Sequence, residues 1–556
     1  MPLKSPKLFL YFLSAVFAIN LLQSYFTELI FDEAYYWHYA QKMAWGYFDH
    51  PPMVAFLIRL SSYFFDGELG VRFMSCLLSV GTLVLLWLMI DNPKKRDYVP
   101  HFFILTFSMT LLNAYGFFTL PDTPLLFFTA LFLWIYKKFI ANATVLSAIF
   151  LGIVMAALMY SKYHAVLVIF FVLLSNLALL KNKYAWLAVI IALLCYIPHF
   201  LWLYENDFVS IKYHLFERPN GAYDFNKYTL GFFVNLVAIF GFTFPWIYKA
   251  LYKTKSSSLF TKALLYLTYG VILFFFISSF NRRVQTQWII VISIPLAIIV
   301  FNYMLENTNT RKWIYRMGII NCVVLLFLRI GLIYEPLFPI FYETHGNKQW
   351  TEEIRAEAGD IPIVFENSYR NAPMYAFYSG NPTYSLNNIY YRRNQYSIDS
   401  SEYQVQHKKI MYVSKSAKSG DASFTRMNGT VYHGKFIENF ESFRKLRCFL
   451  TEEEPLSLDL KKVINFKVFN PYGTDIPLEK IKFGLAYLND HKQVKDVLSV
   501  DAIPTNENIL TLKSNDTTNF TFTLPKPNMK NPGYFRIGIS ENGLNYGLNG
   551  ENIKLK

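Results

Sequence analysis

The feature that most constrains this chain is a series of apolar runs of roughly 20 residues, which recur from the N-terminus to about residue 338. A run of that length crosses the hydrocarbon of a bilayer as a helix. Composition agrees, because 53% hydrophobic, 19% aromatic and 17% charged residues do not suit a soluble protein. We predict a polytopic α-helical membrane protein with eleven spans. They lie at about 8–30, 69–90, 100–118, 123–140, 143–160, 163–180, 184–204, 229–250, 263–280, 286–304 and 317–338.

Beyond about residue 340 the chain is rich in Asn, Lys, Glu, Ser and Thr and contains no spanning run. We expect a transmembrane domain at 1–340, a soluble α/β module at 341–450 and a β-sandwich-like module at 451–556. Alternating polar and apolar residues between regular turns favour the sandwich. Expected elements are a helix at 349–358 and strands at 361–365, 409–413, 463–469, 482–488, 519–524 and 533–539.

Basic residues collect in alternate loops, and such loops face the cytoplasm. The net charge of +14 therefore reflects membrane topology, and nucleic acid is not an expected partner. An odd number of spans places the soluble modules on the extracytoplasmic side of the cytoplasmic membrane. The residues that set this orientation are Lys4, Lys7, Lys94, Lys95, Arg96, Lys137, Lys138, Lys181, Lys183, Lys249, Lys253, Lys255, Lys262, Arg311, Lys312 and Arg316.

The first outer loop, at 31–68, contains adjacent carboxylates, Asp32 and Glu33, directly after a spanning helix. Carboxylates so close to hydrocarbon are costly, which suggests a function. The aromatic residues between the acids suit interfacial helices, the second of which begins after Pro51-Pro52. The alternative is that Asp32 and Glu33 only stabilise the positive end of the first interfacial helix.

A second acid, Asp122, lies in the short outer turn Thr119-Leu120-Pro121-Asp122-Thr123-Pro124. This sequence also suits a helix start with Asp122 as the N-cap residue, so a structural role is the alternative. Basic residues are few on this side, and the alternative for each of them is snorkelling at the interface. They are Lys42, Arg59, Arg72, Lys162, Lys212, Arg218, Lys227, Arg282 and Arg283.

Five motifs follow one another in the membrane domain. In chain order they are Asp-Glu-Ala-Tyr-Tyr-Trp from Asp32, Gly-Tyr-Phe-Asp-His-Pro-Pro from Gly46, Leu-Gly-Val-Arg from Leu69, Pro-Asp-Thr-Pro-Leu-Leu-Phe-Phe from Pro121 and Ser-Lys-Tyr from Ser161. Together they resemble the bacterial branch of the dolichyl-phosphate-mannose–protein mannosyltransferase family, which includes the aminoarabinose transferase of lipid A. The resemblance covers essentially the whole membrane domain and weakens beyond residue 340. It implies the glycosyltransferase C fold.

The resemblance also implies transfer of a sugar from a polyprenyl-phosphate carrier, undecaprenyl phosphate in a bacterium, to an extracytoplasmic protein, lipid A or glycan. Asp32 is the expected general base, with Glu33 beside it and the two roles exchangeable. Asp122 would bind sugar hydroxyls or hold cationic groups in place. Basic groups would stabilise the leaving phosphate. The expected phosphate-binding residues are His50, Arg72, Lys162, Arg282 and Arg283, and the expected carrier and acceptor groove contains Tyr35, Tyr36, Arg59 and Arg218.

We expect no metal and no cofactor, because the four cysteines and the histidines show no metal-ligand spacing. The sequence does not identify the transferred sugar, so both a hexosyl- and a pentosyltransferase remain as alternatives. One alternative is a transporter or flippase for a lipid-linked sugar, which would place ionisable groups near the bilayer midplane. A non-catalytic scaffold and, within the family, a lipid-linked oligosaccharide polymerase or ligase also remain open.

Overall fold

The computed structural model describes residues 7–218, 221–337, 341–451, 463–506 and 508–555. The chain divides into two compact units. The membrane unit comprises Met1–Asp207 and Tyr223–His345, and the C-terminal unit comprises Phe208–Ala222 and Gly346–Lys556. Of the basic residues used to predict the orientation, Lys4 lies outside the described residues.

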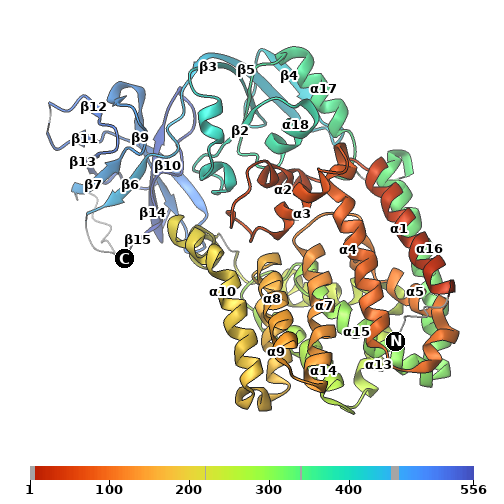
Figure 1. The fold of residues 1–556 in the computed structure, drawn as a ribbon. Coiled ribbons are helices and arrows are strands. Elements are labelled where there is room, and N and C mark those ends of the chain that lie inside the picture. Colours follow the sequence, from red (N-terminus) through yellow and green to blue (C-terminus); the bar gives the residue numbers. More distant parts are fainter. Residues whose placement is uncertain (1–6, 219–220, 338–340, 452–462, 507, 556) are drawn as a thin grey trace. The chain divides into compact units, whose positions relative to one another are not determined.

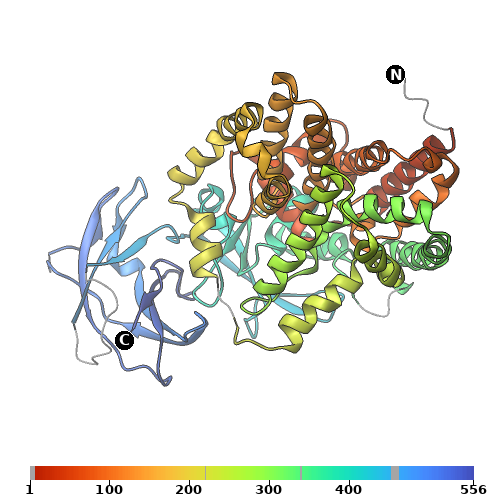
Figure 2. The same cartoon turned by 90° about the horizontal axis from the view of Figure 1, so that it is seen from below.

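The membrane unit is built from helices, as Figures 1 and 2 show in red to green. The chain is a multi-pass membrane protein, and every predicted span coincides with at least one helix. The helices are α1 (Lys7–Phe26), α2 (Phe31–Gln41), α3 (Met53–Ser61), α4 (Gly67–Met89), α5 (Val99–Phe107), α6 (Thr110–Ala114), α7 (Asp122–Ala141), α8 (Val145–Ser161), α9 (Ala165–Leu174), α10 (Lys183–Glu205), α12 (Gly231–Ala238), α13 (Phe244–Lys253), α14 (Leu259–Ser278), α15 (Ser293–Glu306) and α16 (Thr308–Ile333).

The count of eleven spans stays a prediction. Among the described residues, six helices are long and apolar enough to cross a bilayer, namely α1, α4, α7, α10, α14 and α16. A seventh span arises if the two helical segments on either side of residues 239–240, bent by 94°, form one. The helices α8 and α9 and the segment Ile290–Glu306 are apolar but shorter.

One buried amide explains two of the helix breaks. Asn321 of α16 donates from Nδ2 to the carbonyl of Ser108, where α5 ends, at 3.1 Å, and to that of Phe240 at 2.9 Å. Its Oδ1 accepts the N–H of Phe242 at 3.1 Å. Gly241, between Phe240 and Phe242, has φ +50°, and a Cβ there would lie only 2.5 Å from the Asn321 side chain. Backbone groups that a break frees inside a membrane protein need such partners.

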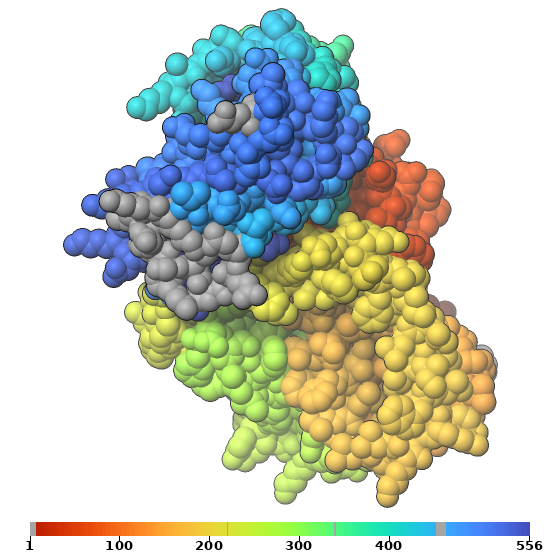
Figure 3. Space-filling view, turned by 90° about the vertical axis from the view of Figure 1, so that its left-hand side faces the viewer, coloured from red at the N-terminus to blue at the C-terminus, as the bar shows by residue number. Residues whose placement is uncertain are grey.

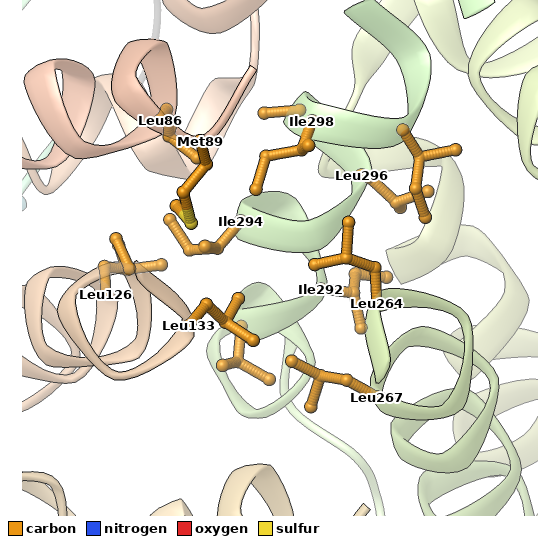
Figure 4. Close-up of a cluster of buried hydrophobic side chains, with 14 of the residues drawn as sticks. Leu86, Met89, Leu126, Leu133, Leu264, Leu267, Ile292, Ile294, Leu296 and Ile298 are labelled. Carbon is orange, nitrogen blue, oxygen red and sulfur yellow. The ribbon is translucent and has the colours of Figure 1, made fainter. Parts of the chain in front are cut away.

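The core of the membrane unit lies where α4, α7, α14 and α15 meet. Leu86, Leu133, Leu267 and Ile294 are fully or almost fully buried there, and Figure 4 shows their side chains converging from four segments. In contrast, α10 exposes a row of large apolar side chains, among them Trp186 and Leu194. The gold surface in Figure 3 belongs to this part of the chain. Such a face suits lipid.

The C-terminal unit contains a five-stranded sheet in the order β2-β1-β3-β5-β4, with β1, β2 and β3 parallel. The helices α17 (Asn347–Ala358) and α18 (Asn371–Ser379) accompany it, so the expected α/β character is confirmed. The strands are β1 (Ile363–Glu366), β2 (Thr383–Leu386), β3 (Lys408–Ser414), β4 (Ala422–Thr425) and β5 (Val431–Phe440).

The predicted β-sandwich is also present, and alternate residues of its strands fill one core. One sheet has the order β10-β9-β14-β15 and the other β11-β13-β7-β6, drawn in blue in Figures 1 and 2. A small third sheet pairs β12 (Thr511–Leu512) with β8 (Ile476–Pro477). The main strands are β6 (Arg447–Leu450), β7 (Val463–Phe469), β9 (Lys482–Leu488), β10 (Val494–Val500), β11 (Ile503–Pro504), β13 (Thr517–Thr523), β14 (Tyr534–Ser540) and β15 (Ile553–Lys554).

Buried polar groups join the α/β module to the sandwich. Glu402 is buried and accepts the hydroxyl of Ser442 at 2.6 Å and that of Tyr472 at 2.9 Å. Arg444 forms an ion pair with buried Glu541, with 3.0 Å between Nε and Oε1. Breaking such pairs is costly, so the two modules form one body.

We predict that Asn321→Leu destabilises the membrane unit by about 2–4 kcal/mol, because the Ser108 carbonyl and the Phe242 N–H lose their partner. The Phe240 carbonyl keeps the N–H and hydroxyl of Thr243. The measurement is thermal unfolding of the purified protein in detergent. Asn302→Leu, on the half-buried surface of α15, is the matched control. Equal midpoints for the two variants would contradict the assigned role.

Candidate functional site

Asp32 and Glu33, the adjacent acids of the first outer loop, lie in the first turn of α2. The chain is extended at Ile30, the N-cap residue, with φ −81° and ψ 159°. Glu33 accepts the N–H of Ile30 through Oε2 at 3.2 Å and so closes the start of the helix. Asp32 precedes it and is half-buried. Adjacent helix residues point about 100° apart, so the two carboxylates face different surroundings.

Glu33 also forms a buried ion pair with Arg72 of α4. Nε of Arg72 donates to Oε1 at 2.8 Å and a terminal nitrogen donates to Oε2 at 2.5 Å, and neither side chain is exposed. The remaining N–H groups of Arg72 donate to the carbonyls of Ser24, Thr27 and Glu28. An arginine has five N–H donors, so these five bonds use all of them.

The same carboxylate fixes the second outer loop. The backbone N–H of Thr119 donates to Oε1 of Glu33 at 2.9 Å. The Thr119 hydroxyl donates to the carbonyl of Val71 in α4 at 3.0 Å, and the ring of Phe118 lies 5.3 Å from the Arg72 guanidinium. Both predicted acidic loops are therefore anchored at one point.

Asp122, the first residue of α7, pairs with Lys162, which caps the C-terminal end of α8. Nζ of Lys162 lies 2.7 Å from Oδ1 and 2.9 Å from Oδ2, and the two side chains are only 7% and 4% exposed. Asp122 is not the N-cap residue of α7, because that position is occupied by Pro121. A direct chemical role for Asp122 stays a prediction. The buried ammonium group of Lys162 is thus fixed in place by the Asp122 carboxylate.

The hydrogen bond from Thr119 to Glu33 brings the loops of Asp32 and Asp122 together, because Asp32 precedes Glu33 and Asp122 lies three residues after Thr119. The two predicted acids, which are far apart in sequence, thus share one region of the membrane unit. Another acid in this region was missed by the sequence reasoning: Glu343, beyond α16, accepts the N–H of Phe31 at 3.3 Å. The only sequence signal for it is the polar run Tyr342-Glu343-Thr344-His345 directly after the last span.

The loop between α2 and α3 is held by aromatic contacts. Tyr47 stacks on Tyr39, with 4.3 Å between ring centroids, and burial raises the pKa of Tyr47 to about 12. Tyr35 donates to Asp49 at 3.0 Å, and Tyr36 lies against half-buried His50. Tyr35 and Tyr36, predicted to line a groove, are both buried.

A buried histidine joins this loop to α10. His199 is not exposed, its Nδ1 lies 2.7 Å from the carbonyl of Trp45, and its Nε2 lies 3.2 Å from the hydroxyl of Tyr163. Since Tyr163 follows Lys162, the contact fixes the end of α8. The described residues contain no group of three or more His, Cys, Asp or Glu side chains placed to hold a metal ion.

The remaining predicted residues are more scattered. Arg59 is exposed on α3, with its guanidinium 5.4 Å from the ring of Tyr63. Arg282 is half-buried and Arg283 is exposed in the segment after α14. That segment is held by Asn235, which donates to the carbonyl of Val284 at 2.9 Å. Arg218 belongs to the C-terminal unit.

Comparison with known proteins agrees with the motifs. Residues 49–202 match the model of the family described as dolichyl-phosphate-mannose-protein mannosyltransferase. A curated relative, the lipid A galacturonosyltransferase RgtD of Rhizobium johnstonii, is 24% identical over 196 residues, which are 34% of this chain and 41% of the relative. The match thus spans about two fifths of that relative's length.

A solved structure shares the fold. The crystal structure of ArnT from Cupriavidus metallidurans, bound to undecaprenyl phosphate, superposes with a TM-score of 0.53 at 13% identity. The superposition covers 73% of this chain and 92% of ArnT. The predicted glycosyltransferase C fold is confirmed, and so is the resemblance to the bacterial branch of the family.

The Asp122–Lys162 pair allows a test of the site's packing. Asp122→Asn and Lys162→Met should each lower stability by about 3 kcal/mol, because each leaves a buried charge without its partner. The double variant should lose less than the sum of the two, as thermal unfolding in detergent would measure.

Glu306→Gln is the matched control, because its partner Lys94 and Glu306 are both more than half exposed. That variant should leave the unfolding midpoint unchanged. Additive losses in the double variant would contradict a direct interaction between Asp122 and Lys162.

Proposed function

Because the membrane unit combines the family's sequence motifs with the fold of ArnT, we propose that the protein is a glycosyltransferase that uses a polyprenyl-phosphate sugar as donor. The observation that carries the proposal is the hydrogen bond from Thr119 to Glu33, which joins the loops of Asp32 and Asp122 at the buried Glu33–Arg72 pair. An acid and nearby cations are what such a transfer requires.

Asp32 is the proposed general base. It accepts the proton of the acceptor hydroxyl, whose oxygen then forms a bond to C1 of the sugar. The bond between C1 and the phosphate oxygen breaks, and the electron pair leaves with the polyprenyl phosphate. Attack from the face opposite the leaving phosphate inverts the configuration at C1. Glu33 is less suited to this role, because its two oxygens already accept four N–H groups from Ile30, Arg72 and Thr119.

Arg72 has a positioning role in this proposal and not the phosphate-binding role expected from the sequence. Its five N–H groups are occupied, and a phosphate would have to displace Glu33 or backbone carbonyls. Lys162 can approach a phosphate while Asp122 holds it in place, and Asp122 can also accept sugar hydroxyls. Arg282, Arg283 and His50 are the other phosphate ligands in the proposal.

The acids lie at the extracytoplasmic ends of the helices in our proposal. The helix α4 begins near Arg72, and at its far end Lys95 donates to the carbonyls of Trp87 and Ile90. Lys137 donates to the neighbouring carbonyl of Met89. These lysines belong to the basic loops that predict the cytoplasmic side. The proposed donor is thus an undecaprenyl-phosphate sugar that reacts outside the cytoplasmic membrane.

The acceptor is proposed at the level of its class, a glycan or glycolipid of the cell envelope. RgtD is a lipid A galacturonosyltransferase by name, and ArnT was solved with undecaprenyl phosphate. These two names support a lipid-linked donor and a glycolipid acceptor for this chain. Hexosyl and pentosyl donors fit the proposal equally.

We predict that Asp32→Asn lowers the rate of transfer by about 10²–10⁴-fold, the usual contribution of a general base. The assay supplies the purified protein with undecaprenyl-phosphate sugars labelled in the sugar and measures release of undecaprenyl phosphate. Asp66→Asn is the matched control, an exposed acid in the loop before α4.

A folded Asp32→Asn variant with the turnover of the wild type would exclude Asp32 as the base. Absence of release by the wild type from every donor would overturn the proposed function.

A further inference from the structure

The C-terminal unit contains a cavity of about 260 Å³ far along the chain from the carboxylates described above. Its walls come from the loop after β2, the turn between β9 and β10, the strand β14 and the segment Phe208–Ala222. Four cations line it, Arg392, Arg393, Lys492 and Arg536, against two carboxylates, Glu217 and Glu551. The lining is thus net positive.

The wall that carries two of the arginines is held in place by hydrogen bonds to backbone carbonyls. Ile389 donates its N–H to the carbonyl of Tyr546 in the sandwich at 2.7 Å, and Tyr391 donates to that of Asn388 at 2.9 Å. Arg393 donates to the carbonyl of Leu548 at 3.3 Å. A site with walls fixed in advance loses less entropy when a ligand binds.

Arg536 lies on β14 and is half-buried. Its Nε and one terminal nitrogen donate to Oδ1 of Asn552, at 3.0 and 2.6 Å. Asn552 is an uncharged partner. Burial and then the nearby Arg393 lower the pKa of Arg536 to about 10, while Glu217 opposes the shift. Arg393 and Arg536 line the same cavity, so their like charges repel, and an anion bound there would relieve that repulsion.

Aromatic rings lie beside the cations of the cavity. The Arg392 guanidinium lies 5.4 Å from the ring of Tyr213 and 4.5 Å from that of Tyr369. Tyr390, also on the cavity wall, is 60% exposed. Lys492 donates to the carbonyl of Phe216, which ties the segment 208–222 to the sandwich. Rings offer an apolar face to the C–H side of a sugar, and the arginines offer paired donors to carboxylate or phosphate.

We infer that this cavity binds an anionic sugar unit, one that carries a carboxylate or a phosphate, of the glycan acceptor. The inference rests on the proposed function, because the acceptor is the glycan that such an enzyme must hold. The volume lies below the range of roughly 300–1,000 Å³ of drug-sized sites, so one or two sugar residues would fill it. The arginines recognise charge, and the tyrosines recognise the ring.

The test is binding of small probes to the full-length protein in detergent, without any donor. The probes are galacturonic acid for a carboxylate, glucose 1-phosphate for a phosphate and galactose as the neutral sugar, each titrated and followed by ligand-observed NMR. At least one anionic probe should bind at least tenfold more tightly than galactose. Whether one or both do so tells which anionic group the site accepts.

Arg393→Gln and Lys492→Gln should each weaken binding of the anionic probe at least fivefold. Lys467→Gln, on β7 in the opposite sheet and outside the cavity lining, should leave it unchanged. Equal affinity for galactose and both anionic probes would overturn the inference, as would unchanged affinity in two folded variants. Release of undecaprenyl phosphate by the wild type is measured separately, so failure of this binding test does not count against the transferase chemistry.

Discussion

The buried pair between Glu33 and Arg72 is the interaction on which the membrane unit's outer end depends. It joins the end of α1, the start of α2, the first turns of α4 and the loop before α7. A charge pair removed from water is costly unless hydrogen bonds satisfy both partners. Here all five N–H groups of Arg72 and both oxygens of Glu33 are satisfied, so this pair can be retained where hydrocarbon begins.

That pair also separates two roles that the sequence left exchangeable. The adjacent carboxylates of Asp32 and Glu33 look equivalent in a motif, but a helix turns by about 100° per residue. Glu33 points to Arg72, whereas Asp32 is half-buried beside it. Sequence alone could not assign these directions, because Arg72 is 39 residues away and its partner is decided by tertiary packing.

Much of the architecture followed from composition and periodicity. The apolar runs located the helices, and alternation located β7 and β9 to the residue. The number of spans stays a prediction. The helix break at Ser108 could not be read from the sequence, because it depends on one amide from α16 that is 213 residues away. The site could be predicted only in part, because tertiary packing also decides which side chains pair. Asp122 and Lys162 were both predicted from the sequence, but their ion pair, which partly neutralises both charges, was not.

The segment Phe208–Ala222 has a further consequence. It lies between α10 and α12 in sequence, yet it packs with the C-terminal unit, through Tyr213 and Arg392 for example. The polypeptide therefore passes between the two units three times, at residues 207–208, 222–223 and 345–346. The C-terminal unit is thus not a detachable module. Residues 208–222 leave the ribosome more than a hundred residues before the rest of that unit. A chain that stopped at residue 345 would therefore contain this segment without the residues against which it packs.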